Sequence, residues 1–175
     1  MQIKLCGSGG QGIVLSGNII GKAGAVFEGK EVVSTQYYGP ESRGGVTTAS
    51  VIISDKKIEY PYVTKADVFI AMSQNTYDSY KEILKEDGML IYDSNLVQPD
   101  KDTHTKYGFP FTKLAQEKIG KSIVANIIML GAFTKISKCI SEENMKKAIL
   151  DSVPKGTEEL NIKAFELGIS ESSKL

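Results

Sequence analysis

The sequence predicts an α/β fold with an open, mostly parallel sheet, helices on both faces and a single domain over residues 1–175. Two observations carry this prediction. Short apolar strands alternate with helical segments along the chain, which is typical of a parallel sheet covered by its crossover helices. The 175 residues suffice for one core, and no internal repeat or low-complexity linker divides them.

The N-terminal elements are expected to be a strand, a glycine-rich turn, a helix and a second strand. Residues 2–6 alternate in hydropathy and end at a glycine cluster, which predicts a strand running into a tight turn. Apolar residues recur over residues 13–28 at the spacing of an amphipathic helix, and Gly29 is a typical C-terminal cap. Residues 31–35 form the second strand, so we expect a βαβ unit with parallel strands.

The middle of the chain is expected to supply most of the remaining strands. The segments concerned are short and rich in apolar or β-branched residues, namely 46–54, 57–60, 67–72 and 89–92. A turn is expected at residues 87–88, and residues 76–84 predict a short helix. Residues 93–107 are polar, so we expect them to be irregular.

The C-terminal third is expected to be helical. Helices are predicted over residues 111–118 and 122–137, and the second is apolar on most sides, so it should be buried. Ser141 is a suitable N-cap for the next helix. A last helix is expected over residues 157–167, before a frayed tail at residues 170–175.

The composition disfavours several classes of function. Lys plus Arg and Asp plus Glu number 21 each, so the formal net charge is zero. Without a dense basic stretch, the chain should bind neither nucleic acid nor an anionic membrane surface. No apolar run reaches the roughly 20 residues that span a bilayer, and the N-terminus has no basic leader followed by an apolar core. We therefore expect a cytoplasmic protein.

The few cysteine and histidine residues do not suggest a metal site. Cys6 and Cys139 lie far apart and no Cys-x-x-Cys occurs, so both thiols are expected to be buried, reduced and inert. His104 is the single histidine and cannot build a His-based site alone. We expect no metal ligand, no iron–sulfur cluster and no catalytic residue on this chain by itself.

A glycine loop is the first candidate site. It matches G-x-G-x-x-G between a predicted strand and a predicted helix, and its residues are Gly7, Ser8, Gly9, Gly10, Gln11 and Gly12. Glycines let the backbone turn tightly and approach a ligand, and the following helix directs its N–H groups and positive dipole end at an anion. The loop is therefore a candidate cofactor-binding site. The alternative is that the glycines only pack the turn and the helix against the sheet.

The second predicted strand lacks an acidic residue at its end. A dinucleotide site uses an Asp or Glu about 20 residues after the glycines to hold the ribose hydroxyls. Here the strand ends in Ser34-Thr35, and Glu31 stands at its start. This arrangement disfavours a nicotinamide-dependent dehydrogenase.

The loop after the second strand is another candidate site, for a ligand or a partner. Its residues are Tyr38, Gly39, Pro40, Glu41, Ser42, Arg43, Gly44 and Gly45. Pro40 and the glycines restrict the backbone, and the planar guanidinium of Arg43 suits carboxylates and phosphates. Glu41 and Arg43 either pair with each other or face a ligand or partner. A rigid surface turn with solvated charges is the alternative.

These motifs together resemble the gamma subunit of 2-oxoacid:ferredoxin oxidoreductases. The resemblance covers essentially the whole chain, through GSGGQG, YGPESRGG, IEYP, ADVFIAM, Asn126 with the following LGA, and NIKAFELG. YGPESRGG is the most specific of them. Its Gly-Pro-Glu-x-Arg-Gly-Gly pattern is closer to the 2-oxoglutarate type, because the pyruvate type more often continues with Arg-Gly-Ala-Pro.

The resemblance implies a Rossmann-like module of a multi-subunit enzyme. Such an enzyme decarboxylates a 2-oxoacid on thiamine diphosphate, passes electrons through iron–sulfur clusters to ferredoxin and releases an acyl-CoA. Thiamine diphosphate and the clusters are expected on partner subunits of the alpha, beta and delta type, and coenzyme A is the candidate ligand near this chain. Any contribution of this chain to the chemistry should therefore come from binding and positioning.

Three other functions stay open at this point. The chain could belong to the pyruvate type, act as a stand-alone NAD(P)-binding oxidoreductase, or serve as a purely structural assembly module with an empty glycine loop. Cofactor titration of the isolated chain tests the second function. A ligand-bound structure of the whole complex separates the third from an enzyme subunit that binds coenzyme A.

Overall fold

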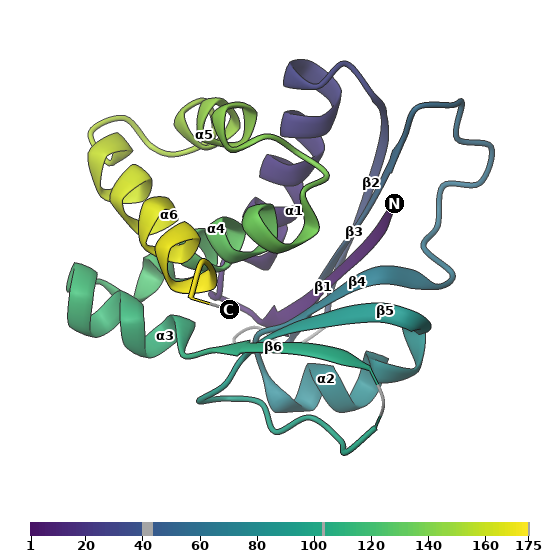
Figure 1. Ribbon diagram of the computed structural model, residues 1–175, viewed down its shortest axis with the longest axis horizontal. Coiled ribbons are helices and arrows are strands. Elements are labelled where there is room, and N and C mark those ends of the chain that lie inside the picture. The colour runs from purple at the N-terminus through teal and green to yellow at the C-terminus, as the bar shows by residue number, and fades with distance from the viewer. Residues whose placement is uncertain (40–43, 103, 175) are drawn as a thin grey trace.

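The computed structural model describes residues 1–39, 44–102 and 104–174 (Figure 1). Their strands form one six-stranded sheet in the order β2-β3-β1-β4-β5-β6. The strands are β1 Gln2–Ser8, β2 Glu31–Tyr38, β3 Val46–Ser54, β4 Ala66–Ala71, β5 Leu84–Asp93 and β6 Thr105–Phe109.

Five of the six strands run in the same direction. β1, β4, β5 and β6 form successive parallel pairs, whereas β3 is antiparallel to its two neighbours, β1 and β2. The expected mostly parallel sheet is therefore confirmed. The expected βαβ unit is modified, because β1 and β2 run parallel but β3 lies between them. The short connection from β2 to β3 suits an antiparallel neighbour, and β3 then pairs with β1 on its other side.

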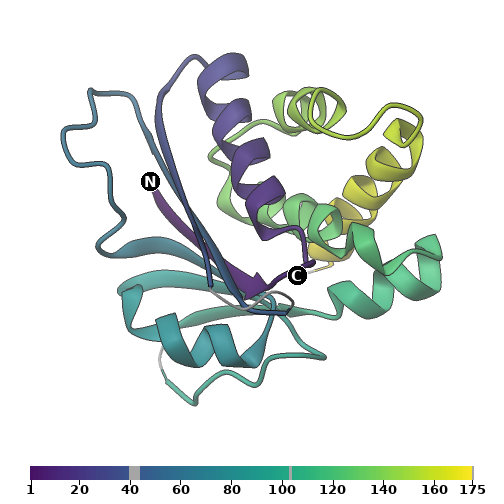
Figure 2. The same ribbon diagram turned by 180° about the vertical axis from the view of Figure 1, so that it is seen from behind.

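Helices cover both faces of the sheet, but unequally (Figures 1 and 2). α1, α4, α5 and α6 lie on one face, and α2 lies on the other. The helices are α1 Ile13–Lys22, α2 Gln74–Tyr80, α3 Phe111–Leu114, α4 Ala125–Ser137, α5 Glu142–Leu150 and α6 Glu158–Ser172. α1 and α3 each continue into a π-helical turn, at Ala23–Phe27 and Ala115–Ile119, and short 3-10 turns occupy Lys81–Ile83 and Ser122–Val124.

The larger core lies between the sheet and the group of helices that contains α4. Every residue of α4 from Ala125 to Thr134 is buried, as its apolar sequence predicts. α1 packs closely on β3, because a side chain at Gly17 would meet the Cβ of Ala49 at 2.6 Å. A smaller apolar cluster, which includes Phe69 and Tyr77, fills the space beneath α2.

Four local expectations are wrong. Residues 57–60 form no strand, since Pro61 cannot donate a ladder hydrogen bond and Tyr60 is exposed. The expected turn at residues 87–88 lies inside β5, where the β4–β5 register shifts at an irregularity. β6 occupies part of the segment expected to be irregular. α6 continues to Ser172, so residues 170–172 of the expected frayed tail are helical.

The boundaries of the remaining helices follow ordinary capping rules. The Oγ of Ser141 accepts a hydrogen bond from the N–H of Asn144 at 3.3 Å, which confirms the predicted N-cap of α5. Gly29 adopts a φ of +67° after the α1 segment, as its expected capping role requires. No helix within the described ranges is long and apolar enough to cross a bilayer.

Candidate functional site

The glycine loop joins the carboxyl end of β1 to the start of α1. Gly12 is the N-cap of α1 and has a φ of +71°, a left-handed conformation that favours glycine. No side chain caps this helix end and no acidic residue lies in its first turn. The first-turn N–H groups, which have no partner within a helix, therefore give this end a partial positive charge.

The two predicted loops lie side by side. β1 and β2 run in the same direction, so the loops that follow them meet at one edge of the sheet. The N–H of Gly9 donates to the carbonyl of Gly45 at 2.9 Å, and the N–H of Gly39 donates to that of Val46 at 2.7 Å. The described parts of both motifs therefore lie together beyond the carboxyl ends of two parallel strands. The Gly9 amide, however, binds the neighbouring loop, so a ligand here must use other donors.

Gly7 and Gln11 belong to the framework of the loop. The Oε1 of Gln11 accepts from the N–H of Ser8 at 2.7 Å, and its Nε2 donates to the carbonyl of Met72 at 2.8 Å. Gln11 thus ties the loop to the end of β4. A side chain at Gly7 would meet this Oε1 at 2.7 Å, so only glycine leaves room for the link.

A cavity of about 910 Å³ opens beside the two loops. α4, α6 and the start of α1 supply its other walls. The described residues that line it are Ser8, Gly9, Gly10, Gly12, Ile13, Val14, Leu15, Tyr38, Gly39, Gly44, Gly45, Thr47, Lys121, Ile123, Val124, Asn126, Ile127, Val153, Pro154, Thr157, Leu160 and Asn161. The volume lies in the range of small-molecule sites, and a mostly apolar wall with a few polar groups is typical of them.

The polar groups of the cavity come from distant parts of the chain. Lys121 is the charged side chain among the described lining residues, and it precedes α4. Asn126 of α4 donates from Nδ2 to the carbonyl of Gly12 at 3.3 Å and to the Oγ of Ser16 at 3.4 Å. A methyl group at Gly12 would overlap this amide. Asn161 of α6 lines the cavity beside Thr157.

The sequence interpretation did not assign Lys121, Asn126 or Asn161 to the site. Asn126 carried a detectable signal, because it is a polar residue in the middle of an otherwise apolar helix. Lys121 and Asn161 carried no local signal, since only the packing of α4 and α6 brings them to the cavity.

The second motif is described only in part. Tyr38, Gly39, Gly44 and Gly45 line the cavity beside the glycine loop. Pro40, Glu41, Ser42 and Arg43 lie outside the described residues. The expected roles of Glu41 and Arg43 therefore stay predictions.

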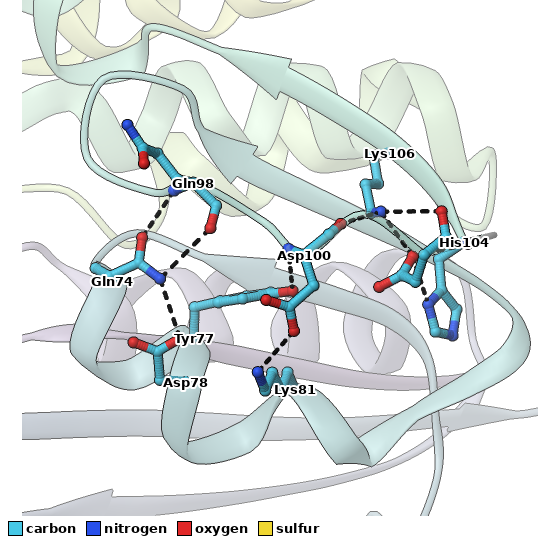
Figure 3. Close-up of polar contacts among 9 residues, drawn as sticks. Gln74, Tyr77, Asp78, Lys81, Gln98, Asp100, His104 and Lys106 are labelled. Carbon is cyan, nitrogen blue, oxygen red and sulfur yellow. Dashed lines mark hydrogen bonds and ion pairs between the residues drawn. The ribbon is translucent and has the colours of Figure 1, made fainter.

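A second polar cluster lies on the other face of the sheet, where it fastens the segment after β5 to α2 (Figure 3). The Oε1 of Gln74 in α2 accepts a hydrogen bond from the N–H of Gln98 at 2.7 Å. Lys81 forms an ion pair with Asp100 at 2.6 Å. Nearby, the ion pair with Lys106 lowers the pKa of Asp102 to about 2. These contacts hold the segment after β5 in place, so the charged groups of this cluster have a structural role.

The described residues bring no metal-binding group together. No set of three or more His, Cys, Asp or Glu side chains in them is placed to hold an ion. Cys6 is buried beneath α2, and burial raises the pKa of its thiol to about 12. Such a thiol stays protonated, so it is a poor nucleophile and a poor metal ligand.

Comparison with known proteins identifies the family. The sequence profile described as pyruvate ferredoxin/flavodoxin oxidoreductase matches residues 2–171. The chain belongs to this family. The 2-oxoglutarate synthase subunit KorC of Methanocaldococcus jannaschii is 50% identical over 177 residues, covering 99% of this chain and 95% of the relative. The pyruvate synthase subunit PorC of the same organism is 35% identical over 182 residues, covering 99% and 98%.

Solved structures agree with this assignment. The gamma subunit of a keto/oxoacid ferredoxin oxidoreductase from Geobacter sulfurreducens superposes with a TM-score of 0.89 at 37% identity, over 99% of both chains. The 2-oxoglutarate:ferredoxin oxidoreductase of Magnetococcus marinus, with 2-oxoglutarate, coenzyme A and succinyl-CoA bound, gives a TM-score of 0.88 at 26% identity, over all of this chain and 31% of that longer chain. The resemblance to gamma subunits and the α/β fold are confirmed.

Proposed function

We propose that this chain is the gamma subunit of a 2-oxoglutarate:ferredoxin oxidoreductase and that its cavity holds coenzyme A. The complete enzyme would convert 2-oxoglutarate and coenzyme A into succinyl-CoA and carbon dioxide, with ferredoxin as electron acceptor. Partner subunits of the alpha, beta and delta type would carry thiamine diphosphate and the iron–sulfur clusters. The complex would work in the cytoplasm.

The choice of 2-oxoglutarate as substrate rests on two relatives from one organism, to which this chain is unequally similar. The chain is 50% identical to the 2-oxoglutarate synthase subunit of Methanocaldococcus jannaschii and 35% identical to its pyruvate synthase subunit, each over nearly the full length. Both relatives come from the same organism, so the difference in identity supports the 2-oxoglutarate branch of the family. The Gly-Pro-Glu-Ser-Arg-Gly-Gly motif favours the same branch.

The residues of this chain do not fit the redox cofactors. An iron–sulfur cluster needs several thiolates, whereas Cys6 is buried beneath α2 and Cys139 follows the far end of α4. The chain's own contribution would be to hold a substrate and to keep water from it, which requires shape and hydrogen bonding rather than a nucleophile.

The chemistry of the cavity suits coenzyme A. The phosphates of coenzyme A need hydrogen-bond donors and positive charge, which the first turn of α1 and Lys121 can supply. Its neutral arm needs an apolar surface, which Val14, Ile127 and Leu160 provide. The Magnetococcus marinus enzyme, whose chain matches this fold, contains bound coenzyme A.

The substrate assignment is tested on the complex purified from its own cells through a tag on this chain. We expect ferredoxin reduction with 2-oxoglutarate to exceed that with pyruvate by at least about tenfold in kcat/KM, a difference of about 1.4 kcal/mol. A complex that prefers pyruvate, or a tagged chain that purifies without partner subunits, would refute the assignment.

The coenzyme A site is tested by replacing a lysine of the cavity and a lysine outside it. Lys121→Ala should raise the KM for coenzyme A about fivefold, because one exposed ion pair contributes up to about 1 kcal/mol. Lys118 is also exposed but does not line the cavity, so Lys118→Ala should leave this KM unchanged. Equal effects of the two substitutions would contradict the site.

A further inference from the structure

Two buried asparagines interrupt the apolar wall of the cavity. Asn126 is 2% exposed and Asn161 is 6% exposed, and both line the cavity. They lie on α4 and α6, two helices whose backbones pack against each other. Buried carboxamides are costly unless their hydrogen bonds are made, so each one calls for a physical explanation.

The orientation of each carboxamide follows from its partner. The Nδ2 of Asn126 faces the carbonyl of Gly12, and the Nδ2 of Asn161 faces the carbonyl of Thr157 at 2.8 Å. A carbonyl oxygen only accepts, so the NH₂ group must face it in both cases. The Oδ1 atoms therefore point to the opposite side, away from these backbone anchors.

Both Oδ1 atoms lack a donor among the described residues. None of the hydrogen bonds among these residues ends on either oxygen, whereas both Nδ2 groups are anchored. The cavity is the space that the two side chains line together.

We propose that Asn126 and Asn161 form a pair of acceptors that recognise N–H groups of the bound ligand. A ligand that fills an apolar cavity displaces the water from both oxygens, so it must bring donors of its own or lose affinity. A fully ionised phosphate group has no donor, and the two acceptors would repel its oxygens. The cavity thus combines anion-binding groups, at the start of α1 and Lys121, with a pair of acceptors on α4 and α6.

The identity of the ligand rests on the proposed function. In coenzyme A, N–H donors occur at the amino group of adenine and at the two amides of the pantetheine arm. Both have the same chemistry toward an acceptor pair, and the fragments adenosine 3′,5′-bisphosphate and pantetheine separate them.

The test uses Asn161→Leu in the complete complex, with binding measured by calorimetry. Asn161 is the cleaner position, because Asn126 also supports Gly12 of the glycine loop. Losing one acceptor should weaken coenzyme A binding about fivefold to tenfold, which corresponds to about 1–1.4 kcal/mol. The fragment that carries the recognised N–H should lose the same factor, and the other fragment should be unaffected.

Asn144→Leu is the matched control. Asn144 also anchors its Nδ2 on a backbone carbonyl, that of Phe27 at 3.0 Å, but it lies at the start of α5 and does not line the cavity. This substitution should leave the affinity for coenzyme A unchanged. An equal loss in both variants, or unchanged affinity in Asn161→Leu, would overturn the proposal.

Hydrogen exchange of the wild-type complex distinguishes the failure of this proposal from that of the proposed function. Coenzyme A should protect the amides of residues 8–15 and 121–127. If protection is present but Asn161→Leu binds normally, only the acceptor pair is refuted. If coenzyme A protects neither segment, it does not bind in this cavity, and both proposals fall.

Discussion

At the scale of single residues, the site depends on one glycine and one asparagine that are far apart in sequence. Gly12 has a left-handed backbone, and the side chain of Asn126 fills the space where its Cβ would lie. This contact fixes the glycine loop against α4. The sequence showed that the loop contains glycines, but it could not show which of them contacts a distant side chain.

Two alanine substitutions in the loop separate the cost of the left-handed backbone from the cost of the contact with Asn126. Gly10 has a φ of +93° and no described atom within 4 Å of its would-be Cβ, so Gly10→Ala should cost only the backbone strain, about 1–2 kcal/mol. Gly12→Ala adds an overlap with Asn126, so it should lower the free energy of unfolding by at least about 1 kcal/mol more. Urea unfolding of the purified chain measures both, and equal costs would exclude the contact.

The thiol of Cys6 gives a second prediction at this scale. Burial raises its pKa to about 12, well above that of an ordinary thiol, so native protein should react slowly with thiol reagents at Cys6. The Cys6 thiol therefore ionises at a lower pH in the unfolded chain than in the folded chain. Stability should therefore fall as pH rises from about 9 towards 12, by up to about 1.4 kcal/mol per unit. Mass spectrometry after alkylation tests the slow reaction of Cys6, and rapid labelling of Cys6 in the native protein would contradict it.

At the scale of elements, the close packing of α4 on α6 builds one wall of the cavity. A side chain at Gly131 would overlap the carbonyl oxygen of Phe165, and one at Gly168 would overlap that of Ile128. The two backbones are thus in direct contact. This contact places Asn126 and Asn161 on the same wall, which neither helix could do alone.

Gly131→Ala tests this packing. The added methyl group must force the two helices apart, so we expect a loss of about 2–4 kcal/mol in the free energy of unfolding. Gly21→Ala in α1 is the control, because its Cβ would lie 3.7 Å from the Cβ of Ser34, an ordinary contact. That substitution should be neutral or stabilising by up to about 1 kcal/mol. Thermal unfolding of both variants measures the difference, and a stable Gly131→Ala would refute the contact.

Strongly apolar segments were predictable as helices or strands, whereas the edge strand β6 was not. The apolar segment over residues 122–137 and the Val- and Ile-rich β3 carry their own signals. β6 has the mixed sequence TKYGF, so its strand structure depends on pairing with β5. The position of β3 between β1 and β2 likewise depends on long-range pairing.

At the scale of the whole molecule, the described residues enclose a cavity but bring together no set of side chains that could hold a metal. The two motifs singled out in the sequence do meet at one edge of the sheet, because β1 and β2 run parallel. The wall facing them comes from α4 and α6, more than 80 residues away along the chain. Local patterns therefore predicted the two loops on one side of the cavity, and its other walls emerged only from the packing of helices.

Ferredoxin reduction by reconstituted subunits tests the central claim most directly. This chain alone should give no turnover, since its described residues hold no set of metal ligands and burial keeps the thiol of Cys6 protonated. Adding it to its partner subunits should produce activity that requires both 2-oxoglutarate and coenzyme A. Turnover by the isolated chain, or full coenzyme A-dependent activity when this chain is omitted, would contradict the account.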